Sequence, residues 1–278
     1  MLALFDGVRL TPTQRRIAQC LLERGTRAAY LSSGELAALA GVSQPSVTRF
    51  AMALGYDGYP ALRRALRNLD GTGDGGAPGP GSPDDEVQHA VRGEAEILAR
   101  LADRLAPAGA DRVALTEAGK LLVASRPLPV LGLRSAAPLA GYFGYFAAKI
   151  HPDVRVLDHG GSLLTDRLEQ ARAAGATAML GVVLPRYPKE ALDALRDARA
   201  AGLSVVVLTD SPVAPATQVA DVVLSAPVGS RLVFDLHTGP MAMAMVLLQA
   251  MCDTAPAQAL GRLEEFEVSA ARRGVFVA

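Results

Sequence analysis

Cysteine is scarce in this 278-residue chain, which contains only Cys20 and Cys252. A disulfide framework needs more cysteines at regular spacings, so a reducing, cytoplasmic environment is expected. The four histidines show no metal-ligand spacing, and the cysteines are not near them in sequence. We therefore expect no metal site and no cofactor.

The chain also lacks a hydrophobic run long enough to cross a bilayer. The longest run extends from Met241 to Met251 and contains Gln249, whereas a spanning helix needs about 20 apolar residues. The first ten residues, MLALFDGVRL, have no basic start followed by a long apolar segment, so no signal peptide is expected. We expect no membrane partner and interpret 241–251 as part of a buried helix.

Net charge is absent as well, because 28 basic residues balance 28 acidic residues. The distribution is nevertheless uneven. Residues 1–70 hold nine arginines against five acidic residues, and the remainder holds 19 basic against 23 acidic residues. A small basic unit joined to a larger acidic unit suits a DNA-binding domain carried by another domain.

A low-complexity segment divides the chain. Residues 70–85, DGTGDGGAPGPGSPDD, consist almost entirely of Gly, Pro, Asp, Ser and Thr. Such a composition buries too little apolar surface to fold, so it predicts a flexible linker. The expected organisation is a helical domain at 1–69, the linker at 70–85 and a second domain at 86–278.

Residues 32–54, SSGELAALAGVSQPSVTRFAMAL, have the spacing of a helix-turn-helix. Ala37 is small where two helices must approach closely, and Gly41 suits a turn with positive φ. Val47 and Phe50, three residues apart, return to the core side of one helix. The motif makes a double-stranded DNA operator the first partner to consider. The alternative is an ordinary pair of helices on a protein surface.

The second helix of this motif would present its N-terminal side chains to the major groove. Glutamine suits adenine, arginine suits guanine or phosphate, and serine and threonine suit either. Arginines on the following helix are expected to meet backbone phosphates, with a solvated helix face as the alternative. The predicted DNA-binding residues are Ser43, Gln44, Pro45, Ser46, Thr48, Arg49 and Arg63.

The periodicity changes after the linker. A long amphipathic helix is marked by Val87, Val91, Leu98, Leu101 and Leu105. Short apolar runs then alternate with helical segments. The runs lie at 128–133, 154–157, 178–184, 203–208 and 222–224, and the helices at about 108–124, 136–150, 163–174, 188–201 and 237–252. This alternation predicts an α/β domain with a parallel sheet covered on both faces.

The run VSQPSVTRFAMALGYDGYPAL at 42–62 resembles the N-terminal domain of the RpiR/MurR family of bacterial transcriptional regulators. The segment VVVLTDSPVAPATQVADVVL at 205–224 resembles the second domain of that family, a SIS (sugar-isomerase-type) α/β sandwich. The resemblance implies a homodimer or homotetramer that binds DNA. It also implies that the second domain senses a metabolite, often a phosphosugar, at the carboxyl ends of the parallel strands.

The sequence departs from the family where that ligand would bind. The loop Leu184-Pro185-Arg186-Tyr187-Pro188-Lys189 replaces the usual Ser-x-Ser-Gly-x-Thr, and Gly132-Leu133-Arg134-Ser135 has an arginine where many relatives have glycine. Two arginines suit a carboxylate or another planar anion, so we expect a small anionic effector, a phosphosugar or a carboxylate. The predicted effector-binding residues are Arg134, Ser135, Arg186, Tyr187, Thr209 and Asp210.

Other interpretations stay open. If the effector site is vestigial, Arg134 and Arg186 would form ion pairs with acidic residues such as Asp158 or Asp210 rather than bind a ligand. An isomerase-type enzyme would need a general base, for which His159, His237 and Asp210 are candidates. A third possibility is a constitutive DNA binder whose second domain only dimerises. An aromatic cluster at 142–146 is expected in the core or in a subunit interface, with a stacking platform for nucleic acid as the alternative.

Overall fold

The computed structural model describes residues 10–25, 28, 31–68, 83–229 and 232–277. The chain divides into two compact units, Met1–Pro80 and Gly81–Ala278, which are treated separately below. Within the described residues, no helix is both long enough and apolar enough to cross a membrane.

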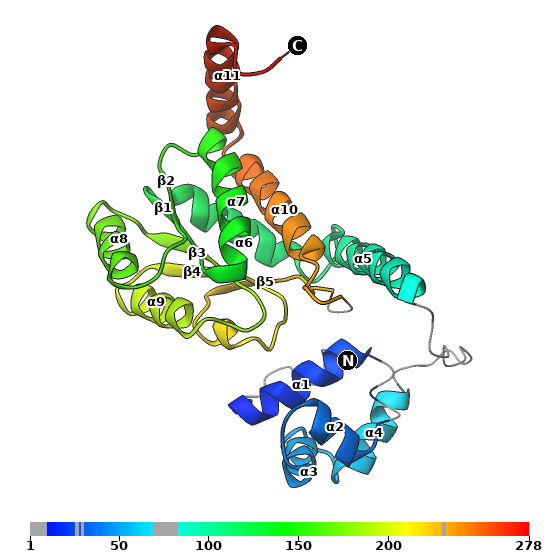
Figure 1. Cartoon of the computed structure of the whole chain (residues 1–278). Helices are drawn as coiled ribbons and strands as arrows, with labels where there is room; N and C mark the ends of the chain where they lie inside the picture. The colour runs from blue at the N-terminus through cyan, green and yellow to red at the C-terminus, as the bar shows by residue number, and fades with distance from the viewer. Residues whose placement is uncertain (1–9, 26–27, 29–30, 69–82, 230–231, 278) are drawn as a thin grey trace. The chain divides into compact units, whose positions relative to one another are not determined.

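The described part of the first unit contains four α-helices (Figure 1), which pack around a small apolar core. They are α1 (Pro12–Arg24), α2 (Ser33–Leu39), α3 (Gln44–Ala53) and α4 (Tyr59–Asn68). Capping boxes begin the first two helices, because Thr11 and Ser32 each exchange hydrogen bonds with the third residue of the helix. The fully buried side chains include Ile17, Leu21, Leu36, Val47, Phe50 and Leu62.

The second unit is built on a five-stranded parallel sheet in the order β2-β1-β3-β4-β5. The strands are β1 (Leu128–Gly132), β2 (Val154–Leu157), β3 (Ala178–Val183), β4 (Ser204–Thr209) and β5 (Val222–Ser225). The two central strands β1 and β3 are buried along their whole length, as expected for a sheet covered on both faces. The predicted α/β class and parallel sheet are therefore confirmed.

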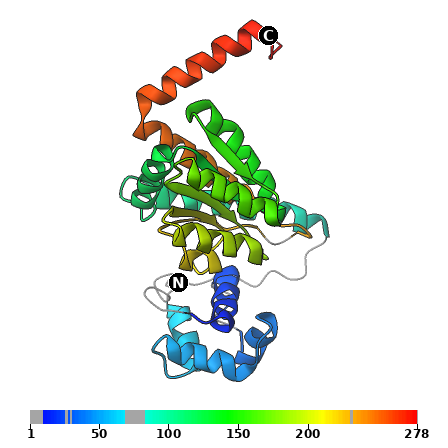
Figure 2. The ribbon, with the colours of Figure 1, turned by 90° about the vertical axis from the view of Figure 1, so that its left-hand side faces the viewer.

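Helices cover both faces of this sheet. One core lies beneath α8 (Ser162–Ala173) and α9 (Lys189–Ala200), the face turned to the viewer in Figure 2. Alternate strand residues point to the opposite core, so Met179 belongs to the first core and Leu180 to the second. The helices of the second core are α5 (Pro83–Leu105), α6 (Arg112–Ala124), α7 (Ala137–Ile150) and α10 (Thr238–Thr254).

Helix α5 differs from the sequence prediction in two ways. It begins at Pro83, within the segment assigned to the linker, because proline is favoured in the first turn of a helix. Its buried side also differs in the first half, where Val87 and Val91 are exposed and Ala90, Glu94 and Ile97 are buried instead. The predicted Leu101 is buried, and Leu105 packs against the core. The rest of the predicted linker, up to residue 82, lies outside the described residues.

Helix α11 (Pro256–Arg273) was not predicted. It follows α10 after a single residue, Ala255, and extends away from the sheet (Figure 1). Its signals were a proline at the first helical position and Gly274 in the left-handed conformation at the C-cap. Only Ala259 and Ala270 are buried on it, so an apolar stripe was too weak to mark the helix.

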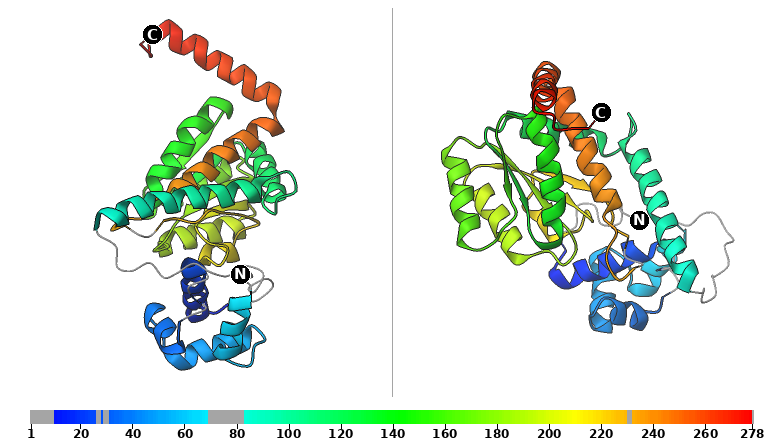
Figure 3. Two further views of the ribbon diagram at one scale, coloured as in Figure 1. Left: turned by 90° about the vertical axis from the view of Figure 1, so that its right-hand side faces the viewer. Right: turned by 45° about the horizontal axis from the view of Figure 1, so that its top comes forward.

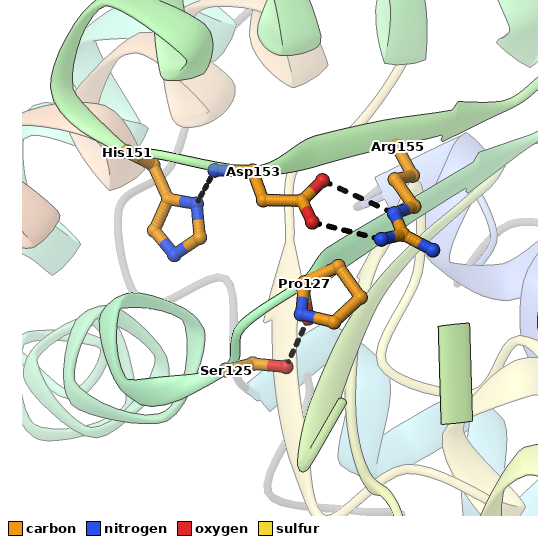
Figure 4. Close-up of polar contacts among 5 residues, drawn as sticks. All are labelled: Ser125, Pro127, His151, Asp153 and Arg155. Atoms are coloured by element: carbon orange, nitrogen blue, oxygen red, sulfur yellow. Dashed lines mark hydrogen bonds and ion pairs between the residues drawn. The ribbon is translucent and has the colours of Figure 1, made fainter. Parts of the chain in front are cut away.

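Buried polar groups organise the amino edge of the sheet (Figure 4). The Ser125 hydroxyl lies 2.7 Å from the carbonyl oxygen of Pro127 and accepts hydrogen bonds from the amides of Thr177 and Ala178. The buried His151 ring accepts a hydrogen bond at Nδ1 from the Asp153 amide. Burial lowers the pKa of His151 below its ordinary value, and the nearby Arg126 charge lowers it further.

Candidate functional site

The turn between α2 and α3 depends on Gly41, whose φ of +60° lies in the left-handed region. The Val42 amide closes the turn by donating to the Ala37 carbonyl at 2.9 Å. Ala37 is buried where α2 and α3 pack together, while Val47 and Phe50 face the core. The spacing predicted from the sequence thus forms a helix-turn-helix.

The N-terminal half of α3 is the exposed side of this motif. Among the predicted DNA-binding residues, Ser46 is half-buried and the other five in this segment are exposed: Ser43, Gln44, Pro45, Thr48 and Arg49. Hydrogen bonds orient several of them. Gln44 Nε2 donates to Ser33 Oγ at 2.8 Å, and Arg49 donates to Ser46 Oγ at 3.2 Å.

Ser43 occupies the N-cap position of α3, as predicted, but its side chain makes no capping hydrogen bond. Its hydroxyl lies 2.9 Å from that of Ser46 instead. Because Ser46 also accepts from Arg49, the two hydroxyls and the guanidinium form one continuous polar surface at the start of the helix. Such a surface offers donors and acceptors to base edges and phosphates.

Arg63 lies on α4 and is only half-buried. Its Nε atom is buried without a hydrogen-bond partner among the described residues. Tyr59, one turn earlier, is buried, and its hydroxyl donates to the Leu31 carbonyl at 3.0 Å. This hydrogen bond ties α4 to the segment that precedes α2, so α4 is held against the motif.

In the second unit, the chain reverses its direction of winding between β1 and β3. Adjacent parallel strands on either side of such a switch point leave a crevice at their carboxyl ends, where ligands of open α/β sheets bind. Arg134 follows β1 and Arg186 follows β3, and both are exposed at this edge. The topology therefore brings the two predicted arginines to one place.

Both arginines have an unusual backbone conformation. The φ angles are +55° for Arg134 and +67° for Arg186, and no other non-glycine residue in the described ranges has a positive φ. A side chain other than glycine pays for this conformation with steric strain, which proteins concentrate at functional positions. Neither side chain has an ion-pair or hydrogen-bond partner within the described part of the chain, and Asp158 contacts His159 instead.

The remaining predicted effector residues are distributed around this edge. Ser135 is exposed in the short 3-10 helix η3 (Arg134–Ala136). Tyr187 donates a hydrogen bond to Asp210 at 3.1 Å, which links the loop after β3 to the end of β4. Thr209 is fully buried, and its hydroxyl donates to the Val183 carbonyl at 2.7 Å, so it joins β4 to β3.

A carboxylate that the sequence analysis missed occupies the N-terminus of α8. The Gly161 amide donates to Glu190 of α9, and the same carboxylate occupies the space that a Cβ on Gly160 would take. The free amides at a helix N-terminus attract anions. At α8 an internal anion fills this role, whereas no side chain caps η3 or α9 at the switch point.

A groove of about 600 Å³ runs between α8 and α9 on the outer surface of the domain. Its floor contains Leu164, Leu168 and Ala194, and its rim is charged. None of the predicted effector residues lines it. The groove is therefore separate from the strand ends that carry Arg134 and Arg186.

Comparison with known proteins places the first unit. Residues 6–71 match the model of the helix-turn-helix domain of the rpiR family. This unit is therefore similar to the helix-turn-helix domain of the rpiR family. The uncharacterized HTH-type transcriptional regulator YfhH of Escherichia coli is 40% identical over 85 residues, which are 31% of this chain and 28% of that protein. The chain thus matches less than a third of the length of this relative.

Solved structures resemble the second unit. The sugar isomerase domain of the RpiR transcription factor from Sphaerobacter thermophilus is 27% identical, with a TM-score of 0.57 over 64% of this chain and 96% of that one. Vibrio vulnificus NanR, complexed with ManNAc-6P, is 17% identical, with a TM-score of 0.57 and 94% of both chains covered. The second unit therefore has the fold of a sugar isomerase (SIS) domain.

The structure also brings an unpredicted acidic residue to the carboxyl edge. Glu94 of α5 is buried beside Gly229, in the connection from β5 to α10. The sequence signal was a glutamate at an otherwise apolar position of a helical stripe. The expected stripe through Val87 and Val91 concealed it, because it placed the buried side of the helix elsewhere.

Proposed function

We propose that the chain is a sequence-specific DNA-binding transcriptional regulator whose SIS-type domain senses a small anion. The observation that carries the DNA-binding role is the exposed N-terminal half of α3 within an rpiR-family domain. In a helix-turn-helix this is the segment that reaches base edges in the major groove. The residues proposed for contact with DNA are those predicted from the sequence, with Arg63 at a phosphate.

The proposed effector site is the crevice between β1 and β3. Two exposed arginines in strained conformations stand at the ends of adjacent strands, without internal partners in the described ranges. A guanidinium pair of this kind suits bidentate binding of a carboxylate or phosphate. The phosphosugar bound to NanR in its complex supports a sugar phosphate as one form of the anion.

We propose a sensing role for the SIS-type domain rather than an isomerase reaction. Isomerisation needs a positioned general base. Of the candidates, His159 is exposed and contacts Asp158 at 2.7 Å, whereas Asp210 is already engaged by Tyr187 and Thr209. We further propose a homodimer that presents two α3 helices to half-sites about 34 Å apart on a near-palindromic operator.

Selection of binding sites from a random-sequence DNA library tests the DNA-binding role. The full chain is expected to enrich an inverted repeat whose half-site centres are about one helical turn apart. Enrichment of no motif at all would overturn the proposal of sequence-specific binding. A single unrepeated motif would overturn the dimeric arrangement.

Calorimetric titration with phosphosugars and small carboxylates tests the effector site. We expect Arg186→Gly and Arg134→Gly each to abolish binding. Lys189→Gln is the control, because it also removes a positive charge nearby, from a residue that is paired with Asp193, and it should leave binding unchanged. Glycine relieves backbone strain of about 1–2 kcal/mol, which offsets its extra unfolded-state entropy of about 0.5–1 kcal/mol. Both variants should therefore fold at least as stably as the wild type. Undiminished binding by both variants would refute the site.

A further inference from the structure

Helix α5 buries a carboxylate that has no partner within the described residues. Glu94 is 6% exposed, and neither of its carboxylate oxygens accepts a hydrogen bond. Buried carboxylates in native proteins are normally paired with a cation or satisfied by several donors. An unpaired carboxylate in the middle of an apolar stripe therefore indicates that a cation or a hydrogen-bond donor binds to it.

The surrounding backbone is shaped to hold this carboxylate. Glu94 Oε1 occupies the space that a Cβ on Gly229 would take, so any larger residue at position 229 would displace the carboxylate. Gly229 pairs with Leu236 in an antiparallel bridge, with hydrogen bonds of 3.0 and 2.8 Å. The side chain is thus enclosed by a defined backbone rather than left in a loose gap.

The carboxylate stands at the same edge of the sheet as the two arginines. Gly229 follows β5 by four residues, and α5 lies beside α10, as Figure 3 (left) shows. Strand β4 separates β3 from β5, so the ends of β3 and β5 are roughly 10 Å apart at the usual strand spacing. The arginine side chains extend from the strand ends, so the distance between the Glu94 carboxylate and a guanidinium suits a ligand about as long as a hexose phosphate.

We propose that Glu94 binds a protonated amine of the effector whose anionic group is held at Arg134 and Arg186. This inference rests on the proposed function, because it adds a second recognition point to the same site. An ammonium group supplies both the charge and the donors that the buried carboxylate lacks. The ligand class is then an anion that also carries an amine about one hexose length away, such as an aminated sugar phosphate.

Matched probe pairs test the proposal by calorimetry on the full chain. The first pair is glucosamine 6-phosphate and glucose 6-phosphate, which differ only in an amine and a hydroxyl. The second pair is 6-aminohexanoate and hexanoate, in which the anion is a carboxylate and the amine is absent from the second member. In at least one pair, the wild type should bind the member with the amine tenfold or more tightly than the member without it. In Glu94→Gln the preference should fall below threefold, while affinity for the amine-free partner is unchanged.

Control variants separate this role from a general effect of charge. Glu96→Gln removes an exposed carboxylate two residues further along α5 and should keep the full preference. Glu94→Leu should raise the melting temperature of the free protein, because it removes a buried unpaired charge, and should abolish the thermal shift caused by the amine. If Glu94→Gln does not fold, Gly229→Ala displaces the carboxylate without removing it and should also lose the preference.

The outcomes distinguish the inference from the function on which it rests. Equal affinity for both members of each pair would mean that a proton or the chain itself satisfies Glu94, and would overturn the inference alone. Retention of the preference by Glu94→Gln would overturn it as well. Failure of all four probes and of the wider phosphosugar and carboxylate set to bind would overturn the proposed anion sensing.

Discussion

The Gln44 side chain donates a hydrogen bond to the hydroxyl of Ser33 across the turn of the helix-turn-helix, with a distance of 2.8 Å. The first residue of α3 is thereby tied to the first residue of α2. This contact uses one of the two N–H groups of the Gln44 amide and leaves the other N–H and the amide oxygen available. Readout of adenine needs one N–H and the oxygen of a glutamine amide, so Gln44 can contact a base while Ser33 holds it.

Ser33→Ala tests that relationship. Removing an exposed neutral hydrogen bond should lower the free energy of unfolding by no more than about 1 kcal/mol. Because Gln44 keeps the atoms that contact a base in either case, Ser33→Ala should bind the operator about as tightly as the wild type in an electrophoretic mobility assay. Gln44→Ala should instead relax the preference at one base pair of each half-site. Loss of operator binding in Ser33→Ala without loss of stability would show that Ser33 itself contacts DNA.

Arg49 and Arg63 should have separable effects on DNA binding. Arg49→Ala should cost about 1–3 kcal/mol of discrimination between the selected operator and random DNA, as expected for a lost base contact. Arg63→Ala should weaken both DNAs similarly and reduce the slope of log affinity against log salt by about one. Affinities measured by fluorescence anisotropy over a salt series check both. An equal loss on operator and random DNA for Arg49→Ala would contradict its role in base readout.

Two glycines of the motif should respond oppositely to alanine. Gly41 has a φ of +60° and nothing within 4 Å of a Cβ, so Gly41→Ala should destabilise by about 1–2 kcal/mol through backbone strain alone. Gly34 lies inside α2, and Gly34→Ala should stabilise by up to about 1 kcal/mol. Urea unfolding of the full chain, followed for the first unit, measures both. The same sign for the two variants would contradict the left-handed turn.

Acid should destabilise the second unit through His151. Burial and the Arg126 charge hold the pKa of His151 below its unfolded value, so the unfolded chain takes up a proton first as the pH falls. The free energy of unfolding should be steady above about pH 7 and decrease as the pH drops through about 6.5. Thermal unfolding between pH 5 and 8 checks this direction.

His151→Gln should remove most of that dependence on pH, and His89→Gln, an exposed histidine on α5, should leave it unchanged. Exposed carboxylates contribute little between pH 5 and 8, since their ordinary pKa values lie near 4. A pH profile unaltered by His151→Gln would mean that the ring is not the group that titrates.

Local patterns in the sequence determined most of the elements, α11 excepted, and the organisation into a helical and an α/β part. The spacing of Ala37, Gly41, Val47 and Phe50 specifies a helix-turn-helix because each position has a steric requirement set by its immediate neighbours. Short apolar runs likewise predicted the five parallel strands, since strands buried on both faces need little else. These inferences required no knowledge of which distant segments meet.

Tertiary structure decided which side of α5 is buried and what that side contains. Periodicity through Val87 and Val91 indicated a helix but misplaced the buried face of its first half, because both faces of α5 carry apolar residues. The second half is buried at Leu101, as predicted. Packing against the β5–α10 connection buried Glu94 beside Gly229, and the strand order 2-1-3-4-5 placed Arg134 and Arg186 at one switch point. Pairing between segments far apart in sequence depends on the whole fold, so no local pattern could determine it.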